Sequence, residues 1–197
     1  MNKIPSLNLQ DFVSGNSTQQ QQFIVDLGRA FEEIGFVAIS GHYLSEALID
    51  ELYAQIKAFF DLPEDIKKKY EIEGLGGQRG YTSFGKEHAK GKKEADLKEF
   101  WHFGQYAEVP EILKPHYPPN VMVEELPAFN EVGENVFKAL EKTAMALLRA
   151  ISLHLGLDQH YFDGFVATGN SILRPIHYPP IQQAPKNAER AAAHGDI

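Results

Sequence analysis

The chain of 197 residues is 43% hydrophobic and 23% charged, which is typical of a soluble globular domain and not of a disordered segment. Its formal net charge of −8 argues against nucleic acid or an anionic membrane as the main partner, because phosphate groups would repel it. The absence of cysteine excludes disulfides, thiolate nucleophiles and thiolate metal sites, and it leaves His, Asp and Glu as candidate metal ligands.

The N-terminus lacks the apolar run of a signal peptide, and an acidic residue, Asp11, follows soon after it. No stretch approaches the ~20 apolar residues that are needed to span a membrane. We therefore predict a cytoplasmic protein.

Short strands and helices are predicted to alternate over the first third of the chain. The helices are indicated by apolar residues at helical spacing, and their starts by polar capping residues or by proline at the first helical position. The predicted elements are a strand within residues 4–11, a helix capped by Ser17 or Thr18 and ended by Gly35, a short buried strand over residues 36–39, a helix capped by Ser45, and a further helix start at Pro63.

Strand composition returns in the middle of the chain, and one long helix follows it. Residues 88–98 carry charges of both signs and are interpreted as a solvated loop or edge. The predicted elements are strands over residues 79–84 and 99–103, a long core-packed helix from Pro127 to Gly156, a short helix capped by Asp158, a strand over residues 171–178, and the start of another strand over residues 191–197.

A possible metal site lies in the segment His194-Gly195-Asp196. On a strand, residues i and i+2 point to the same face, so His194 and Asp196 could bind one metal ion together. An imidazole and a carboxylate are two of the three ligands of the facial triad that binds iron(II). With eight histidines and 27 acidic residues in the chain, roughly one such match is expected by chance. A polar terminal tail is therefore the alternative interpretation.

Five ordered sequence blocks place this segment in a wider context. They are Phe31 to His42 with a G-F-hydrophobic-G-H pattern, Phe59 to Tyr70 with F-F-x-L-P followed by lysines, Arg79-Gly80-Tyr81, Leu173 to Pro180 with L-R-x-x-x-Y-P-P, and His194-Gly195-Asp196. In this order the blocks resemble the isopenicillin N synthase family, which includes 2-oxoglutarate-dependent oxygenases of plants and bacteria. The resemblance covers the whole chain.

The resemblance implies an α+β fold in which N-terminal helices pack on a distorted double-stranded β-helix (jelly roll). Only the opening strands would be present, because such a fold would need roughly another hundred residues to complete its eight strands. We therefore expect residues 1–197 to form a single, truncated domain, with a helical region of short strands over residues 1–166 and the first jelly-roll strands over residues 167–197. The second histidine ligand and an Arg-x-Ser pair for the cosubstrate would lie in the missing part.

The resemblance also implies roles for particular residues. His194 and Asp196 would be iron(II) ligands, and Tyr178 would bind the 2-oxoglutarate cosubstrate. An asparagine usually stands two residues before this tyrosine, and its replacement by Ile176 keeps open a reaction in which the substrate itself supplies the electrons.

Arg79 and Tyr81 would line the substrate entrance. The alternatives are a surface ion pair for Arg79, and core packing for Tyr81 and Trp101.

For the complete protein, the resemblance implies an enzyme that uses iron(II), 2-oxoglutarate and O2 to oxidise a small organic substrate by hydroxylation, desaturation or ring closure. The alternative is a non-catalytic binding module in which the long helix from Pro127 serves as a partner surface. A zinc hydrolase is a third possibility, but no general base and no closed three-ligand set are found for it. The oligomeric state is not indicated by the sequence.

Overall fold

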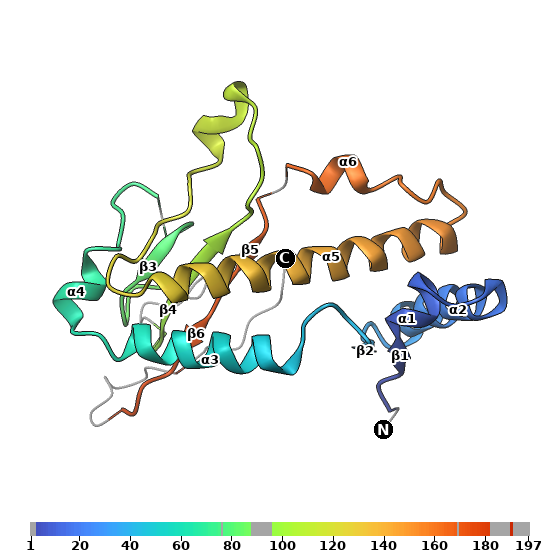
Figure 1. Ribbon diagram of the computed structural model, residues 1–197, viewed down its shortest axis with the longest axis horizontal. Helices are drawn as coiled ribbons and strands as arrows, with labels where there is room; N and C mark the ends of the chain where they lie inside the picture. The colour runs from blue at the N-terminus through green and yellow to red at the C-terminus, as the bar shows by residue number, and fades with distance from the viewer. Residues whose placement is uncertain (1–2, 76, 88–95, 169, 182–189, 191–197) are drawn as a thin grey trace. The chain divides into compact units, whose positions relative to one another are not determined.

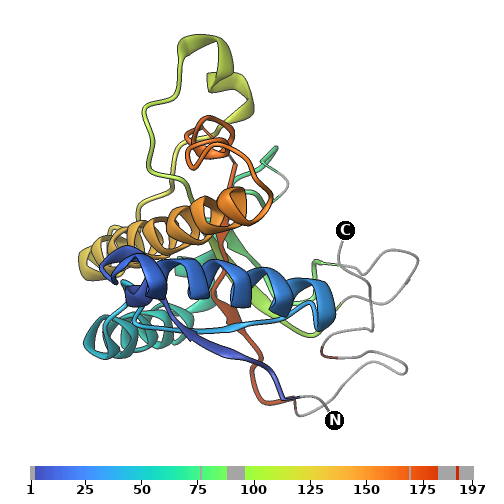
Figure 2. The same cartoon turned by 90° about the vertical axis from the view of Figure 1, so that its right-hand side faces the viewer.

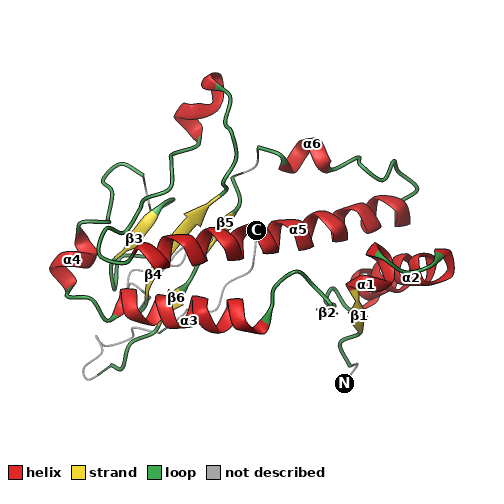
Figure 3. Ribbon diagram, in the orientation of Figure 1, coloured by secondary structure: helices red, strands yellow, loops and turns green. Residues whose placement is uncertain are grey.

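The computed structural model describes residues 3–75, 77–87, 96–168, 170–181 and 190. The chain divides into two compact units. Unit 1 contains Met1–Ile49 and Asn135–Gly169, and unit 2 contains Asp50–Glu134 and Asn170–Ile197. Two of the three boundaries between the units fall within helices, α3 (Glu46–Phe60) and α5 (Pro127–His154), which are labelled in Figures 1 and 3, and the third follows residue 169. Among the described helices, none is both long enough and apolar enough to cross a membrane.

Unit 1 begins with a strand and two helices, β1 (Ser6–Asn8), α1 (Leu9–Val13) and α2 (Ser17–Glu33). Strand β2 (Ala38–Ser40) returns parallel to β1, and Leu7 pairs with Ile39. Helix α1 packs beside α2, as Figure 2 shows in blue. A short helix, α6 (Asp163–Val166), follows the C-terminal half of α5.

The core of unit 1 lies between these helices. Its members are apolar residues of α1, α2 and the second half of α5. The buried set is Leu9, Phe12, Phe23, Ile24, Leu27, Ala146 and Ala150.

Unit 2 is built around a sheet. It contains the greater part of α3, helix α4 (Glu64–Lys68), the 3-10 helix η1 (Glu111–His116), and strands β3 (Gly80–Thr82), β4 (Glu99–Gly104), β5 (Ile172–Leu173) and β6 (Ile176–His177). Strand β4 is central, and β3, β5 and β6 all pair with it in antiparallel fashion.

An aromatic core packs against one face of this sheet. Trp101 is 0% exposed, and its ring centroid lies 4.9 Å from that of Phe59 and 5.2 Å from that of Phe129. Phe103 lies 5.1 Å from Phe129 and occupies the space over Gly133, where a Cβ would lie 2.3 Å from its ring. The interpretation of Trp101 as a core residue is therefore confirmed.

The structure corrects three local expectations. The cap of α2 is Asn16 and not Ser17 or Thr18, because its side chain accepts from two backbone N–H groups and Gln19 completes a capping box. The strand predicted as buried over residues 36–39 is observed at Ala38–Ser40, where only Ile39 is partly buried, and Phe36 before it is 67% exposed. Asp96 and Lys98, predicted in a solvated loop, are both buried, and the ion pair between them offsets the cost of burying their charges.

The remaining elements agree in type with the predictions but differ in extent. Ser45 caps α3, since its Oγ accepts from the Leu48 N–H at 3.2 Å. The strand predicted over residues 171–178 is observed as β5 and β6, which are separated by Arg174 and Pro175. The strand expected over residues 191–197 lies outside the described residues.

Candidate functional site

Strand β4 presents two chemically different faces. Successive side chains of a strand point to opposite sides, and directly opposed residues of paired strands share a side. Tyr81 is opposite Trp101, and His177 is opposite Glu99. We call this side the Trp101 face. Its members are Tyr81, Glu99, Trp101, Phe103, Leu173 and His177.

The other side is called the Phe100 face. Thr82 and Ile176 are both opposite Phe100 on the neighbouring strands. Between β5 and β6 the register does not change, and the Pro175 C=O accepts from the Trp101 N–H at 3.0 Å. The ladder of backbone hydrogen bonds between β4 and residues 172–177 is interrupted at Pro175, because proline has no N–H to donate. The Phe100 face therefore contains Thr82, Phe100, His102, Ile172, Arg174 and Ile176.

A guanidinium group and an imidazole meet on the Phe100 face. Arg174 Nε donates to His102 Nε2 at 2.5 Å, and His102 Nδ1 contacts the carbonyl of Gly77. Burial, followed by the positive charge of Arg174, lowers the pKa of His102 to about 4. His102 is therefore neutral at pH 7, with a proton on Nδ1 and a lone pair on Nε2. This arrangement uses both ring nitrogens and excludes His102 as a metal ligand.

Arg79 is buried beside the same face. Its side chain covers Gly104, where a Cβ would lie 2.0 Å from the guanidinium, and Arg79 is only 2% exposed. Nη2 donates to Asn170 Oδ1 at 2.8 Å and Nη1 donates to the Gln78 carbonyl at 2.7 Å, while Nε is buried without a partner among the described residues. Burial lowers the pKa of Arg79. The alternative interpretation of Arg79 as a surface ion pair is therefore wrong.

A buried charge network lies on the Trp101 face. Glu99 Oε2 accepts from Lys67 Nζ at 2.8 Å and from the Tyr81 hydroxyl, while Oε1 contacts His177 Nδ1 at 2.8 Å. Burial alone would raise the pKa of Glu99, but the hydrogen bonds from these three residues outweigh burial and lower it. The Glu99 side chain is 5% exposed. The network fixes α4 and β6 to the central strand.

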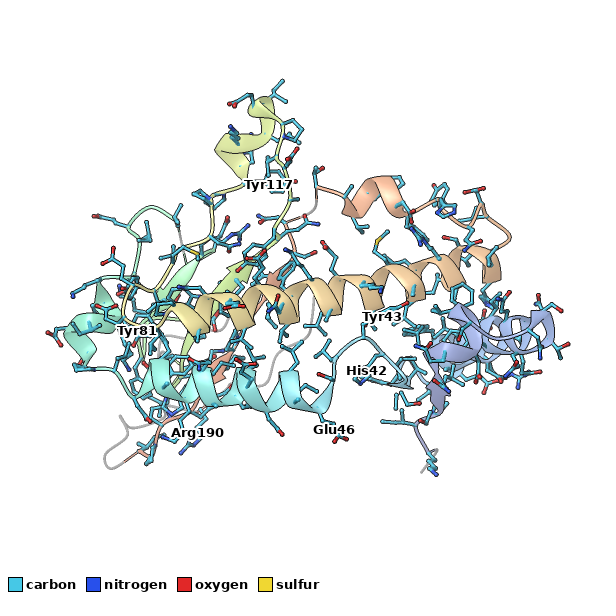
Figure 4. All side chains as sticks on the ribbon, in the orientation of Figure 1. His42, Tyr43, Glu46, Tyr81, Tyr117 and Arg190 are labelled. Carbon is cyan, nitrogen blue, oxygen red and sulfur yellow. The ribbon has the colours of Figure 1, made fainter. Side chains whose placement is uncertain are left out.

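Tyr81 (labelled in Figure 4) is part of this network and is 2% exposed, as core packing would give. It also borders a cleft of about 620 Å³ that lies against the Phe100 face. The cleft is lined by residues of three segments, among them Glu71, Thr82, Lys86, Glu87 and Phe100. It therefore contains both acidic and basic groups.

The predicted iron and cosubstrate residues lie further along the chain. His194 and Asp196 are outside the described residues. Tyr178 directly follows β6, is 39% exposed, and accepts through its carbonyl from Arg190 Nη1 at 3.2 Å. Within the described ranges no group of three His, Asp or Glu side chains could hold a metal ion.

Sequence reasoning missed Glu99, Lys67, His102 and Arg174 as members of polar clusters. The only sequence signals were the place of Arg174 in the L-R-x-x-x-Y-P-P block and that of Lys67 among the lysines that follow F-F-x-L-P. Glu99 and His102 have no distinctive spacing, and their partners come from distant segments such as residues 177 and 77.

Comparison with known proteins decides the family. Residues 4–125 match the family model described as the N-terminal region of the non-haem dioxygenase in morphine synthesis. The chain belongs to the non-haem dioxygenase family. The matched residues run from β1 to the 3-10 helix η1 and include strands β3 and β4.

Two similar proteins are named 2-oxoglutarate-dependent dioxygenases. A 2-oxoglutarate-dependent dioxygenase from Dothideomycetidae sp. is 30% identical over 98% of this chain and 60% of its own length. Another from Aspergillus rugulosus is 32% identical over 98% of this chain and 61% of its own length. The dioxygenase chain thus spans about 60% of the length of these relatives.

Solved structures agree with these relatives. A 2OG-Fe(II) oxygenase family protein from Caulobacter crescentus is 38% identical, with a TM-score of 0.82 over 100% of this chain and 62% of that protein. A full-length Neurospora crassa protein, solved in complex with alpha-KG, is 25% identical, with a TM-score of 0.73 over 91% of this chain and 54% of that protein. The relatives described as oxygenases support an enzyme over the alternative of a non-catalytic binding module.

Proposed function

We propose that this dioxygenase chain is part of an iron(II)- and 2-oxoglutarate-dependent oxygenase that oxidises a small organic substrate. The observation that carries the proposal is the family match over residues 4–125, which includes the central strand β4 and its partner β3. The oxidation is a hydroxylation, a desaturation or a ring closure.

Strands β5 and β6, which lie within residues 167–197, would be the first strands of a double-stranded β-helix. Their antiparallel pairing with β4 supports this assignment. The single domain with a boundary near residue 166, and the cytoplasmic location, stay predictions from the sequence.

His194 and Asp196 would hold the iron, together with a third ligand from another segment. An imidazole and a carboxylate are ligands that suit iron(II), and the chain has no cysteine that would favour zinc or copper. When bound, iron(II) and 2-oxoglutarate activate O2, with release of succinate and carbon dioxide. The two protein side chains fix the metal in place and leave part of its coordination sphere open.

Tyr178 would bind 2-oxoglutarate. Its exposed side chain follows the last described strand, so its hydroxyl can donate to a carboxylate oxygen of the cosubstrate. Ile176 cannot supply the amide that usually assists it. A reaction in which the substrate supplies the electrons is therefore the alternative that the experiment must test.

Arg79 and Tyr81 would contribute to substrate binding. For Arg79, the support is a buried cationic group whose Nε has no partner in the described part of the chain. For Tyr81, the support is its position at the cleft. The packing of Tyr81 against Glu99 favours a supporting role for this residue.

The test is carried out on the full-length protein. Iron content is measured after anaerobic loading, and succinate release from 2-oxoglutarate is followed under O2. His194→Ala and Asp196→Ala are expected to reduce bound iron by at least about tenfold, since loss of a ligand or its support typically has this effect. Tyr178→Phe is expected to raise the KM for 2-oxoglutarate and to leave iron binding unchanged.

His116→Ala is the matched control, because this histidine lies in η1 and is not assigned to the metal site. Undiminished iron binding in both ligand variants would overturn the iron assignment. Oxidation of substrate without any need for 2-oxoglutarate would overturn the cosubstrate assignment and favour the variant in which the substrate supplies the electrons.

A further inference from the structure

Arg174 is a firmly held, partly exposed cation on the Phe100 face. Its guanidinium carbon lies 4.6 Å from the centroid of the Phe100 ring, so the cation rests over the aromatic face. Nε donates to His102, and Nη1 donates to Glu87 Oε1 at 3.2 Å. The side chain is nevertheless 38% exposed. Three contacts therefore hold the group in one orientation while leaving it open to a ligand.

The hydrogen bond to His102 requires a particular form of the imidazole. Nε2 can accept from Arg174 only if it carries no proton, and Nδ1 is then the donor to the Gly77 carbonyl. The backbone of Gly77 makes this contact with a φ of +75°, a conformation that residues other than glycine rarely adopt. His102 is itself 4% exposed and cannot reach a ligand directly. Its role is to orient Arg174.

The guanidinium keeps unused donors. Nε and one N–H of Nη1 are engaged, whereas Nη2 has no hydrogen-bond partner within the part of the chain that the structure describes. Arginine presents its N–H groups in a planar fork that matches the two oxygens of a carboxylate. A carboxylate is therefore the ligand that fits the free edge best.

The local charge favours an anion as well. Arg174 and Lys98 share Glu87, and Lys98 also pairs with Asp96, at 2.6 Å to Glu87 and 3.0 Å to Asp96. Arg79 lies near enough to His102 for its positive charge to lower the pKa of the imidazole, and its partners in the described residues are neutral amide and carbonyl groups. A carboxylate bound at Arg174 would interact favourably with this second cation.

The neighbouring surface is apolar. Ile172 and Ile176 lie on the same face and are 39% and 41% exposed. A ligand whose carboxylate meets Arg174 can therefore place a hydrocarbon or aromatic body against these side chains.

We propose that Arg174 binds a carboxylate of the substrate and that His102 is its positioning residue, so that the substrate is a small acid with an apolar body. The proposal rests on the proposed function, since it assigns the substrate class of the same enzyme. 2-Oxoglutarate is also a carboxylate, and the experiment must distinguish the two sources.

The probes are phenylacetate and its neutral isostere phenylacetamide, with 2-oxoglutarate as a third ligand. Binding to the iron-free, full-length protein is followed by NMR titration, with the 15Nε signals of the arginines and the 15N signals of the His102 ring as reporters. Phenylacetate is expected to shift the Arg174 and His102 signals, and phenylacetamide to bind at least about tenfold more weakly, because hydrogen bonds to charged groups are the stronger ones.

Arg174→Gln is expected to weaken phenylacetate binding about tenfold, and Arg174→Lys less, since lysine keeps the charge but loses the planar fork. His102→Phe should weaken phenylacetate binding and move the Arg174 signal. His102→Gln retains a hydrogen-bond acceptor, so it should keep part of the wild-type affinity and leave the Arg174 signal closer to its wild-type position. Arg149→Gln is the matched control. Arg149 is 37% exposed and also paired with an acid, Asp163, but it belongs to unit 1, and its loss should not affect binding.

Equal binding of phenylacetate and phenylacetamide, or unchanged phenylacetate binding in Arg174→Gln, would overturn the proposal. So would a weakening of 2-oxoglutarate binding in Arg174→Gln that exceeds the weakening of phenylacetate binding, because Arg174 would then serve the cosubstrate. The folded state of each variant is checked from the dispersion of its amide signals. Because the titration needs neither iron nor turnover, its outcome is independent of whether the protein proves to be an oxygenase.

Discussion

Gly28 is a position at which the usual effect of a glycine-to-alanine substitution should be reversed. Alanine in a helix interior is normally favoured over glycine by about 1 kcal/mol. In α2, however, a Cβ on Gly28 would lie 2.1–2.3 Å from the ring atoms of His154. The ring would have to leave its contact with Glu32 Oε1 at 3.0 Å. We expect Gly28→Ala to lower the unfolding free energy by about 1–3 kcal/mol, measured by urea denaturation.

Two variants test this cause. Gly164→Ala in α6 is the matched control, because an added Cβ there meets none of the described atoms within 4 Å, and it should not lower the stability. His154→Ala removes the ring and should make Gly28→Ala tolerable, so that the two effects are not additive. A Gly28→Ala protein more stable than the wild type would contradict the close packing of α2 against the imidazole.

At the scale of elements, β4 shows how far the sequence could be interpreted. Its composition predicted a strand because aromatic residues favour one. The sequence could not assign its faces, because all six residues are buried and the usual alternation of apolar and polar residues is absent. The roles of Glu99 and His102 depend on their hydrogen bonds with Lys67 and Arg174, which come from other parts of the chain, so the strand sequence alone did not indicate them.

The Glu99 network gives the sheet a pH-dependent stability. The folded-state pKa of Glu99 lies below its ordinary value of 4.5, so the stabilisation is fully present above that value and is lost as the pH falls through the folded-state pKa. Glu99→Gln leaves Lys67 buried without its carboxylate. We expect the unfolding free energy at pH 7 to fall by on the order of 3 kcal/mol, and its decline below pH about 4.5 to become shallower, measured by denaturation across pH.

An exposed pair provides the matched control for this prediction. Lys68 and Glu64 form an ion pair at 2.5 Å with side chains that are 52% and 70% exposed, and Glu64→Gln should change the stability little. Adding Lys67→Met to Glu99→Gln should recover part of the lost stability, because the unpaired buried cation is then gone. An equal effect of Glu64→Gln and Glu99→Gln would mean that the network is not specially stabilising.

At the scale of the whole molecule, the sequence predicted the types of elements better than their arrangement. The long helix from Pro127 was predicted within two residues of its observed end at His154, since its apolar spacing repeats over many turns. The division into two units was not predicted, because each unit combines segments that are distant in the sequence. The order of the motifs, and not any composition, indicated the dioxygenase family.

The exposed part of the Phe100 face should govern self-association. Ile172 and Ile176 are 39% and 41% exposed, and exposed apolar side chains on a sheet favour contacts between molecules. We expect the double variant Ile172→Lys, Ile176→Lys to associate less than the unaltered chain in sedimentation velocity at increasing protein concentration, with little change in thermal stability. Leu173→Lys is the matched control, because Leu173 lies between them on the Trp101 face opposite Phe103. A lysine there would be placed against the aromatic core and should unfold unit 2 instead. Unchanged self-association in the double variant would show that another surface joins the molecules.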